Sequence, residues 1–180
     1  MTILCELAKK YRTDKLSKHN YTPIYFDMLK DRRESTKRVL EIGIGNEDYA
    51  AGGLAIGASL RMWEEFFPNA EIIGFDFDPK SMVNEGRILS VQCDQGSESS
   101  LKEAIAIVGE GTFDLIVDDG SHMPDHQMLT AQMLLPLLSP DGFYVIEDVY
   151  SAICVPIGYT SNIFCTGAGP DDVLVVIRPA

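Results

Sequence analysis

Short apolar runs alternate along the chain with segments whose apolar residues recur every three or four positions. The first pattern is typical of strands buried on both faces of a sheet, and the second of amphipathic helices. The strands expected from it are residues 38–44, 70–77, 87–92, 112–117, 141–149, 162–166 and 173–177. The expected helices are residues 1–11, 22–33, 59–67, 97–108 and 124–138, with Ser59 capping the third and Pro124 in the first turn of the last.

This alternation predicts an α/β protein with a doubly wound, mostly parallel seven-stranded sheet and helices on both faces. The last two strands are joined by the short turn AGPDD, which leaves no room for a helical crossover. They are therefore expected to form an antiparallel hairpin. We expect a single domain over 1–180, in which a helical segment (1–35) precedes the core (36–180).

The net charge of the chain limits the classes of partner that it is expected to bind. Its 180 residues hold 15 Lys and Arg against 27 Asp and Glu, a net charge of −12, which argues against nucleic acid and anionic membranes as partners. No apolar run approaches the length of a membrane span. The four cysteines are far apart and form no CxxC pair, so we expect a reduced, cytoplasmic protein. The composition leaves a homo-oligomer open.

Polar and glycine residues gather where the strands end, and in such sheets ligands bind at that edge. Gly43 and Gly45 follow the first strand and let a backbone approach a ligand, although a tight turn alone would explain them. Asp48 stands where a dinucleotide motif has its third glycine, which disfavours a pyrophosphate. Asp76 is placed to bind ribose hydroxyls or, like Asp78, to cap a helix. Asp94 either accepts from an adenine amino group or caps the helix that starts near Ser97.

The densest chemistry is in VDDGSHMPDH and in the later pair Glu147-Asp148. Asp119, Glu147 and Asp148 are expected to converge, and packed carboxylates need a positive charge between them. Oxygen ligands favour Mg²⁺, Ca²⁺ or Mn²⁺ over zinc. His122 would then be a general base, the alternative being a loop histidine bonded to a carbonyl group. For His126 a structural role at a helix end is favoured.

Several motifs, in this order, resemble the class I S-adenosylmethionine-dependent methyltransferases. They are EIGIG, GASLRMWEEFFPNAEIIGFDFD, CDQ, FDLIVDDGSHMPDHQ and LSPDGFYVIEDV. Within that class they are similar to the macrocin O-methyltransferase group, whose KYGTDK…HxYxxxY opening resembles KYRTDKLSKHNYTPIY here. The resemblance implies a Rossmann-like fold, S-adenosyl-L-methionine and Mg²⁺ as cofactors, and O-methylation of a hydroxyl on a sugar or glycosylated small molecule.

The resemblance also implies roles for individual residues. Glu41, Gly43 and Gly45 would border the methionine part of the cofactor, Asp76 the ribose, and Asp94 with Gln95 the adenine. Ser59 and Asp118 complete the predicted cofactor-binding set, although the sequence leaves open whether Asp118 shares in metal binding or only supports Asp119. The metal ligands would be Asp119, Glu147 and Asp148, and the base His122.

The chain departs from the group's pattern in three places. Arg12 replaces a glycine of the opening motif, the loop 46–58 is longer and more acidic than expected, and residues 150–161 leave little room for a helix. Residues 11–25 are the expected lid over the acceptor. The sequence leaves two other functions as alternatives. A dinucleotide-dependent oxidoreductase is disfavoured by the missing third glycine and the missing Tyr-x-x-x-Lys pair. A non-catalytic binding protein is disfavoured by the intact acidic motifs.

Overall fold

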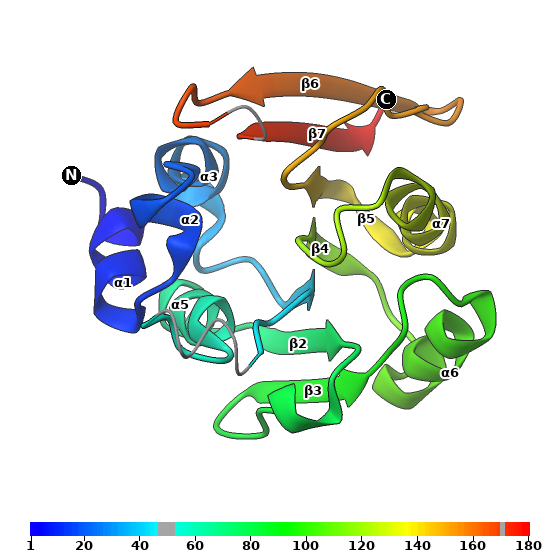
Figure 1. Cartoon of the computed structure of the whole chain (residues 1–180), viewed down its shortest axis with the longest axis horizontal. Coiled ribbons are helices and arrows are strands. Elements are labelled where there is room, and N and C mark those ends of the chain that lie inside the picture. Colours follow the sequence, from blue (N-terminus) through cyan, green and yellow to red (C-terminus); the bar gives the residue numbers. More distant parts are fainter. Residues whose placement is uncertain (47–52, 170–171) are drawn as a thin grey trace.

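The computed structural model describes residues 1–46, 53–169 and 172–180, and shows the expected seven-stranded sheet in the order β3-β2-β1-β4-β5-β7-β6 (Figure 1). Five strands are parallel: β1 (Arg38–Ile42), β2 (Glu71–Asp76), β3 (Ile88–Gln92), β4 (Phe113–Asp118) and β5 (Leu138–Ile146). The strand β7 (Val173–Pro179) runs antiparallel to both β5 and β6 (Tyr159–Cys165). The predicted fold class and the C-terminal hairpin are therefore confirmed. Loop residues 47–52, including Asp48, lie outside the described part.

Helices cover both faces of the sheet. One face carries α1 (Ile3–Tyr11), α2 (Asp14–Ser17), α3 (Thr22–Leu29) and α5 (Ala58–Phe66), and the other carries α6 (Glu98–Val108) and α7 (Pro124–Leu134). Three short 3₁₀ turns follow strands or helices: η1 (Lys30–Arg32), η2 (Pro79–Ser81) and η3 (Leu135–Leu137). Each layer of helices packs on its own apolar core, one on each side of the sheet.

Several boundaries differ from those expected. The strands β5 and β6 each begin three residues earlier than expected, at Leu138 and Tyr159. The polar segment between the two expected N-terminal helices contains the short helix α2. Ser59 does not cap α5: the N-cap is Gly57 in a left-handed conformation, and Ser59 lies inside the first helical turn. The helix expected over 124–138 ends at Leu134, since Pro136 lacks an amide hydrogen and disfavours helical backbone before it.

The alternation of side chains along the strands decides which layer each strand-end residue faces. In β4, Leu115 and Val117 belong to the core beneath the N-terminal helices, whereas Ile116 belongs to the core beneath α6 and α7. The next two residues, Asp118 and Asp119, continue this alternation and meet different surroundings.

None of the helices in the described residues has both the length and the apolar character needed to cross a bilayer. All four cysteines are unpaired, two of them buried (Cys5 and Cys93) and two exposed (Cys154 and Cys165).

Candidate active site

A cavity of about 430 Å³ opens at the carboxyl ends of β1 to β4, where the sequence predicted a ligand crevice. The predicted residues that line it are Gly43, Gly45, Ser59, Asp76, Asp94, Gln95 and Asp119. Glu41, Asp118, His122, Glu147 and Asp148 do not line it. The N-terminal segment adds Arg12, Thr13 and Asp14 to its wall, and α7 adds His126. The cavity is thus enclosed by the sheet edge and the segment before β1.

Gly43 is required where β1 approaches β4. Its φ is +83°, and a Cβ atom built on it would lie 2.1 Å from the backbone oxygen of Asp119. Only glycine fits so close an approach in a left-handed conformation. The turn therefore brings bare backbone to the floor of the cavity, as a bound ligand would need.

Asp76 joins the ends of β2 and β1. One carboxylate oxygen accepts from the backbone N–H of Ile44 and the other from that of Asp78, both at 2.9 Å. Asp78 itself caps η2 by accepting from the amide of Lys80 at 2.9 Å. The capping role weighed for this pair therefore falls to Asp78, and Asp76 stays at the cavity wall.

Gln95 supports the wall through bonds within the protein. Its amide nitrogen donates to Asp118 at 2.9 Å and to Thr130 at 3.2 Å, and its oxygen accepts from the backbone N–H of Ser121 at 2.6 Å. Neighbouring Asp94 is exposed and accepts from the amide of Gly96 at 2.9 Å, while Ser97 caps α6. Of the two residues predicted for adenine, Asp94 is the one with free surface.

Lys15 is the residue that the sequence did not reveal. Its side chain is 1% exposed, and its Nζ lies 2.7 Å from Asp119, 2.8 Å from Glu147 and 3.2 Å from Glu41. The burial of this ammonium opposes its charge, but the three carboxylates raise its pKa well above the usual value. Two of the three acids expected to converge, Asp119 and Glu147, thus share a protein ammonium with Glu41, whereas Asp148 does not contact it.

Two aromatic side chains complete the hydrogen bonds of this cluster. Tyr25 donates from its hydroxyl to Glu147 at 2.5 Å, and Trp63 donates from its indole nitrogen to Glu41 at 2.8 Å. Glu41 is fully buried and Glu147 nearly so. Glu41 therefore anchors Lys15 behind the cavity wall and does not border the cavity itself.

His122 lies between the carboxylates of Asp119 and Asp148. Its Nε2 is 3.3 Å from Oδ1 of Asp119, and its Nδ1 is 3.8 Å from Oδ2 of Asp148. Burial lowers the pKa of His122, but the contacts with Asp119 and Asp148 raise it by more, so the net shift of the pKa is upward. Both His122 and Asp148 adopt left-handed backbone, with φ of +58° and +51°. Strained backbone of this kind gathers at functional sites.

Two groups of side chains in the described residues approach closely enough to share a cation. The first is Asp119, His122 and Asp148, and the second is His19, Asp148 and Asp172. Glu147 belongs to neither group; its Oε1 contacts Lys15 and Tyr25. Two of the three predicted metal ligands are thus brought together with the predicted base. The third, Glu147, is held one residue away.

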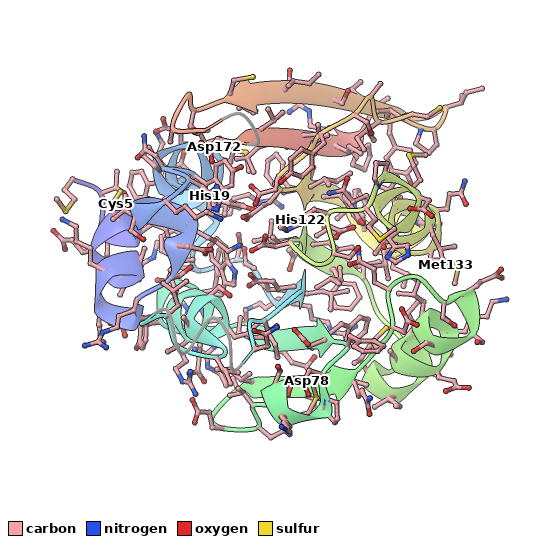
Figure 2. The ribbon with its side chains drawn as sticks, in the orientation of Figure 1. Cys5, His19, Asp78, His122, Met133 and Asp172 are labelled. Atoms are coloured by element: carbon pink, nitrogen blue, oxygen red, sulfur yellow. The ribbon has the colours of Figure 1, made fainter. Side chains whose placement is uncertain are left out.

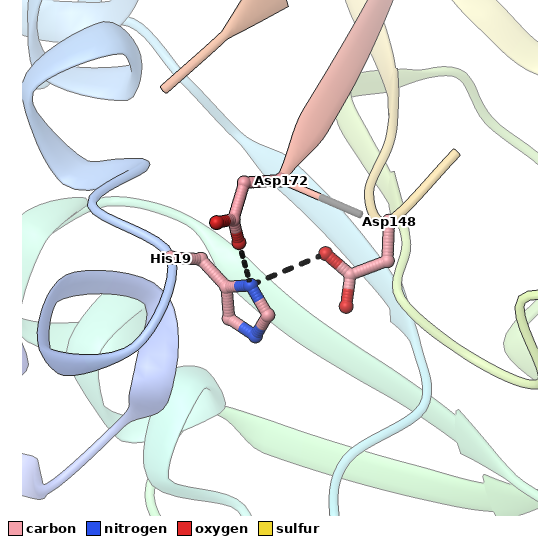
Figure 3. Close-up of side chains that lie close together, drawn as sticks. All are labelled: His19, Asp148 and Asp172. Carbon is pink, nitrogen blue, oxygen red and sulfur yellow. Dashed lines mark hydrogen bonds and ion pairs between the residues drawn. The ribbon is translucent and has the colours of Figure 1, made fainter. Parts of the chain in front are cut away.

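The second group links the N-terminal segment to the start of β7. Nδ1 of His19 lies 2.5 Å from Asp172 and 3.4 Å from Asp148, and all three residues are buried (Figure 3). Tyr21 stacks on His19 and donates to Asp148 at 2.6 Å. Figure 2 shows His19 beside Asp172, His122 nearer the centre of the molecule, and Asp78 apart from them near β3. The one sequence signal for these contacts is the N-terminal motif KYRTDKLSKHNYTPIY, which contains His19 and Tyr21.

His126 sits in the first turn of α7, where its Nδ1 lies 2.9 Å from the hydroxyl of Ser121. Its ring closes against Gly96, where an added Cβ would come within 2.6 Å. These contacts agree with the structural role favoured for His126, although the residue also reaches the cavity wall.

The comparisons with known proteins agree with this architecture, although no family model matches the chain. The chain is 41% identical over 150 residues to mycinamicin VI 2''-O-methyltransferase of Micromonospora griseorubida, covering 83% of this chain and 36% of that protein. It is also 41% identical over 150 residues to demethylmacrocin O-methyltransferase of Streptomyces fradiae, with coverages of 83% and 37%.

A similar solved structure is the MycE methyltransferase of the mycinamycin pathway in complex with Mg, S-adenosylhomocysteine (SAH) and mycinamycin VI. The TM-score is 0.72 at 41% identity, covering 82% of this chain and 39% of that one. Fold and strand-end site define a class I S-adenosylmethionine-dependent methyltransferase. The chain belongs to this class and is related to the macrocin O-methyltransferase group. It spans little more than a third of the length of these curated relatives.

Proposed function

We propose that the chain carries the site of a Mg²⁺-dependent O-methyltransferase that uses S-adenosyl-L-methionine and acts on a hydroxyl of a sugar or glycosylated small molecule. One observation carries the proposal: a strand-end cavity of the cofactor-binding type has, at the end of β4, a carboxylate that also belongs to a compact Asp–His–Asp group. Asp119 lines the cavity and, with His122 and Asp148, forms that group. The names of the related enzymes support the reaction class.

The cavity residues fit the predicted cofactor contacts. Gly43 and Gly45 offer close backbone approach to the methionine part, with Ser59 beside them, while Asp76 would bind the ribose and Asp94 the adenine. The bound cofactor supplies an electrophilic methyl group on a sulfonium. Glu41 and Asp118, which we predicted to touch the cofactor, act behind the wall in this proposal and hold the lining residues in place. Gln95 lines the cavity, but its amide group bonds to Asp118, Thr130 and Ser121.

The donor set fits a hard divalent cation, because Asp119 and Asp148 both present oxygen to His122 and to one another. Oδ2 of Asp119 is taken up by Lys15, but Oδ1 is directed to His122. We assign Asp119 and Asp148 as ligands of Mg²⁺, which would lower the pKa of an acceptor hydroxyl. Glu147 remains a predicted ligand, and its contacts with Lys15 and Tyr25 both use one oxygen, Oε1.

We assign His122 the role of general base. Its imidazole lies between the two carboxylates, which raise its pKa and so make it a stronger proton acceptor for a hydroxyl placed within reach. The chain's residues thus orient the acceptor and receive its proton, and positioning of this kind supplies much of the rate in a displacement reaction.

Methyl transfer to demethylated glycosides with vicinal hydroxyls, followed by mass spectrometry, tests the proposal. His122→Gln is expected to abolish turnover while the dissociation constant of SAH changes by less than about threefold, because His122 does not line the cavity. Asp125→Asn, an exposed change three residues away, is the matched control and is expected to keep full turnover. Binding of SAH without transfer to any acceptor, in the presence of Mg²⁺, would favour the binding-protein alternative.

A further inference from the structure

Arg12 occupies a backbone position that suits glycine. It ends α1 in the left-handed region, with φ +61° and ψ +43°, and its N–H closes the helix on the carbonyl oxygens of Ala8 and Lys9. Glycine adopts this conformation without strain, whereas a residue with a Cβ does not. The arginine is therefore kept at some cost to the fold.

The side chain of Arg12 makes no stabilising polar contact with the rest of the described residues. Within the described residues its guanidinium takes part in no ion pair or hydrogen bond, unlike Arg33, Arg38, Arg61 and Arg87, which all bond to neighbouring residues. Arg12 instead lines the cavity of the candidate active site. A cationic group that has no partner among the described residues, and that is placed at a ligand cavity, is available to a ligand.

The charges around the cavity indicate which part of a ligand would need Arg12. The charged carboxylates in the described lining are Asp14, Asp76, Asp94 and Asp119, and Arg12 is the one lysine or arginine among those lining residues. Lys15 is close by, but its ammonium is buried against three carboxylates. S-adenosylmethionine carries two cationic groups and a single anionic one, the α-carboxylate, in its methionine part. That carboxylate would be repelled by the acidic wall without a cation.

The position of Arg12 along the cavity matches that part of the cofactor. Arg12 is three residues before Lys15, whose ammonium contacts Glu41 at the end of β1 and Asp119 at the end of β4. The predicted ribose and adenine contacts, Asp76 and Asp94, follow β2 and β3 on the other side of β1. Arg12 is therefore placed at the side predicted for methionine.

We propose that the guanidinium of Arg12 binds the α-carboxylate of S-adenosylmethionine. The inference rests on the proposed function. A guanidinium presents two parallel donors to a carboxylate, which makes such pairs stronger than neutral hydrogen bonds.

Two ligands separate this role from a structural one when titrated by calorimetry: SAH, and 5'-methylthioadenosine, which lacks the carboxylate and amino groups. Arg12→Gly is expected to weaken SAH binding about 10- to 100-fold, the range of a charge-assisted bond, and to change 5'-methylthioadenosine binding less than about twofold. Without ligand, its melting temperature is expected to equal or exceed that of the wild type, because glycine suits the backbone. Arg12→Lys is expected to bind SAH with intermediate affinity.

Lys18→Ala is the matched control, since it removes one exposed positive charge from the same segment away from the cavity; it is expected to bind both ligands as the wild type does. Equal binding of SAH by the wild type and Arg12→Gly would overturn the inference, as would equal weakening of both ligands. If the wild type binds neither ligand, the proposed function itself fails, a result distinct from a failure of Arg12 alone.

Discussion

Asp118 faces the layer of α6 and α7, whereas Asp119, the next residue, faces the N-terminal helices. On the first side the carboxylate is fully buried among neutral groups, with Gln95 donating at 2.9 Å and the hydroxyl of Tyr144 at 3.3 Å. Burial raises the pKa of Asp118 to about 6, although the hydrogen bonds oppose the shift. On the second side burial again favours the protonated form, but the charge of Lys15 and the contact with His122 lower the pKa of Asp119 to about 2.

The surroundings of Asp118 and Asp119 differ in one respect that keeps Asp119 ionised: a positive charge. The neutral donors satisfy hydrogen bonds on Asp118 but do not supply the charge that an ionised buried carboxylate needs. Lys15, from a segment more than a hundred positions earlier in the chain, supplies it to Asp119. A carboxylate that is to bind Mg²⁺ must be ionised, and the side with Lys15 is the side with His122 and Asp148.

The strongest way to break this contrast is Lys15→Met, which keeps much of the side-chain volume and removes the charge. Two buried carboxylates (Glu41 and Glu147) and the partly buried Asp119 would then face one another without a cation, and we expect the free energy of unfolding to fall by about 3–5 kcal/mol. Urea denaturation at neutral pH measures it. The control is Lys10→Met, which breaks an exposed pair with Glu65 and is expected to change stability little. A loss below about 1 kcal/mol for Lys15→Met would show that the ammonium does not hold the cluster.

The pH dependence of stability tests the other carboxylate of the pair, Asp118. Because the folded pKa of Asp118 is about 6 and its unfolded value about 3.8, the folded state binds more protons between these values. The contribution of Asp118 to stability is therefore greatest below about pH 4 and is lost as the pH rises through about 6, a difference on the order of 3 kcal/mol.

Asp118→Asn cannot ionise, so its stability relative to the wild type is expected to increase between pH 4 and 7. Chemical denaturation of both proteins across this range measures the difference, in which the titrations of the other carboxyl groups largely cancel. A difference that stays constant with pH would contradict a raised pKa for Asp118.

A smaller effect is expected at His19, where an imidazole meets two carboxylates. His19→Leu removes the donor shared by Asp148 and Asp172, and we expect a loss of about 1–3 kcal/mol for the buried polar groups left behind. Asp172→Asn keeps an oxygen that accepts from His19 and is expected to change stability by less than about 1 kcal/mol. Thermal unfolding compares the two variants. Equal losses would mean that the charge of Asp172, rather than the hydrogen bond from His19, stabilises this contact.

The sequence predicted the parts of this arrangement that follow from local pattern. Alternating apolar runs gave the sheet, the antiparallel hairpin and the edge at which Gly43, Asp76 and Asp119 meet. The convergence of Asp119 with Asp148 follows from the adjacency of β4 and β5, and the structure confirms it. The N-cap at Gly57 was missed because the favoured capping residue, Ser59, stands two positions later.

The contacts made by the N-terminal segment were not predictable in the same way. Lys15 and His19 lie in a polar stretch without apolar periodicity, so their burial depends entirely on partners far away in the chain. Glu41 and Gln95 were expected to touch a cofactor, yet both point their polar groups at other protein residues. Strand-end position fixes that a residue lies near the cavity, whereas the neighbouring layer decides whether its side chain faces the ligand or the protein.

Calorimetric titration of Mg²⁺ into the protein saturated with SAH, compared between the wild type and Asp119→Asn, tests the central claim most directly. The account predicts that the wild type binds SAH and then Mg²⁺, and that Asp119→Asn keeps SAH affinity within a few fold while losing the Mg²⁺ signal. Unchanged Mg²⁺ binding in the variant, or a folded wild type that binds neither ligand, would contradict it.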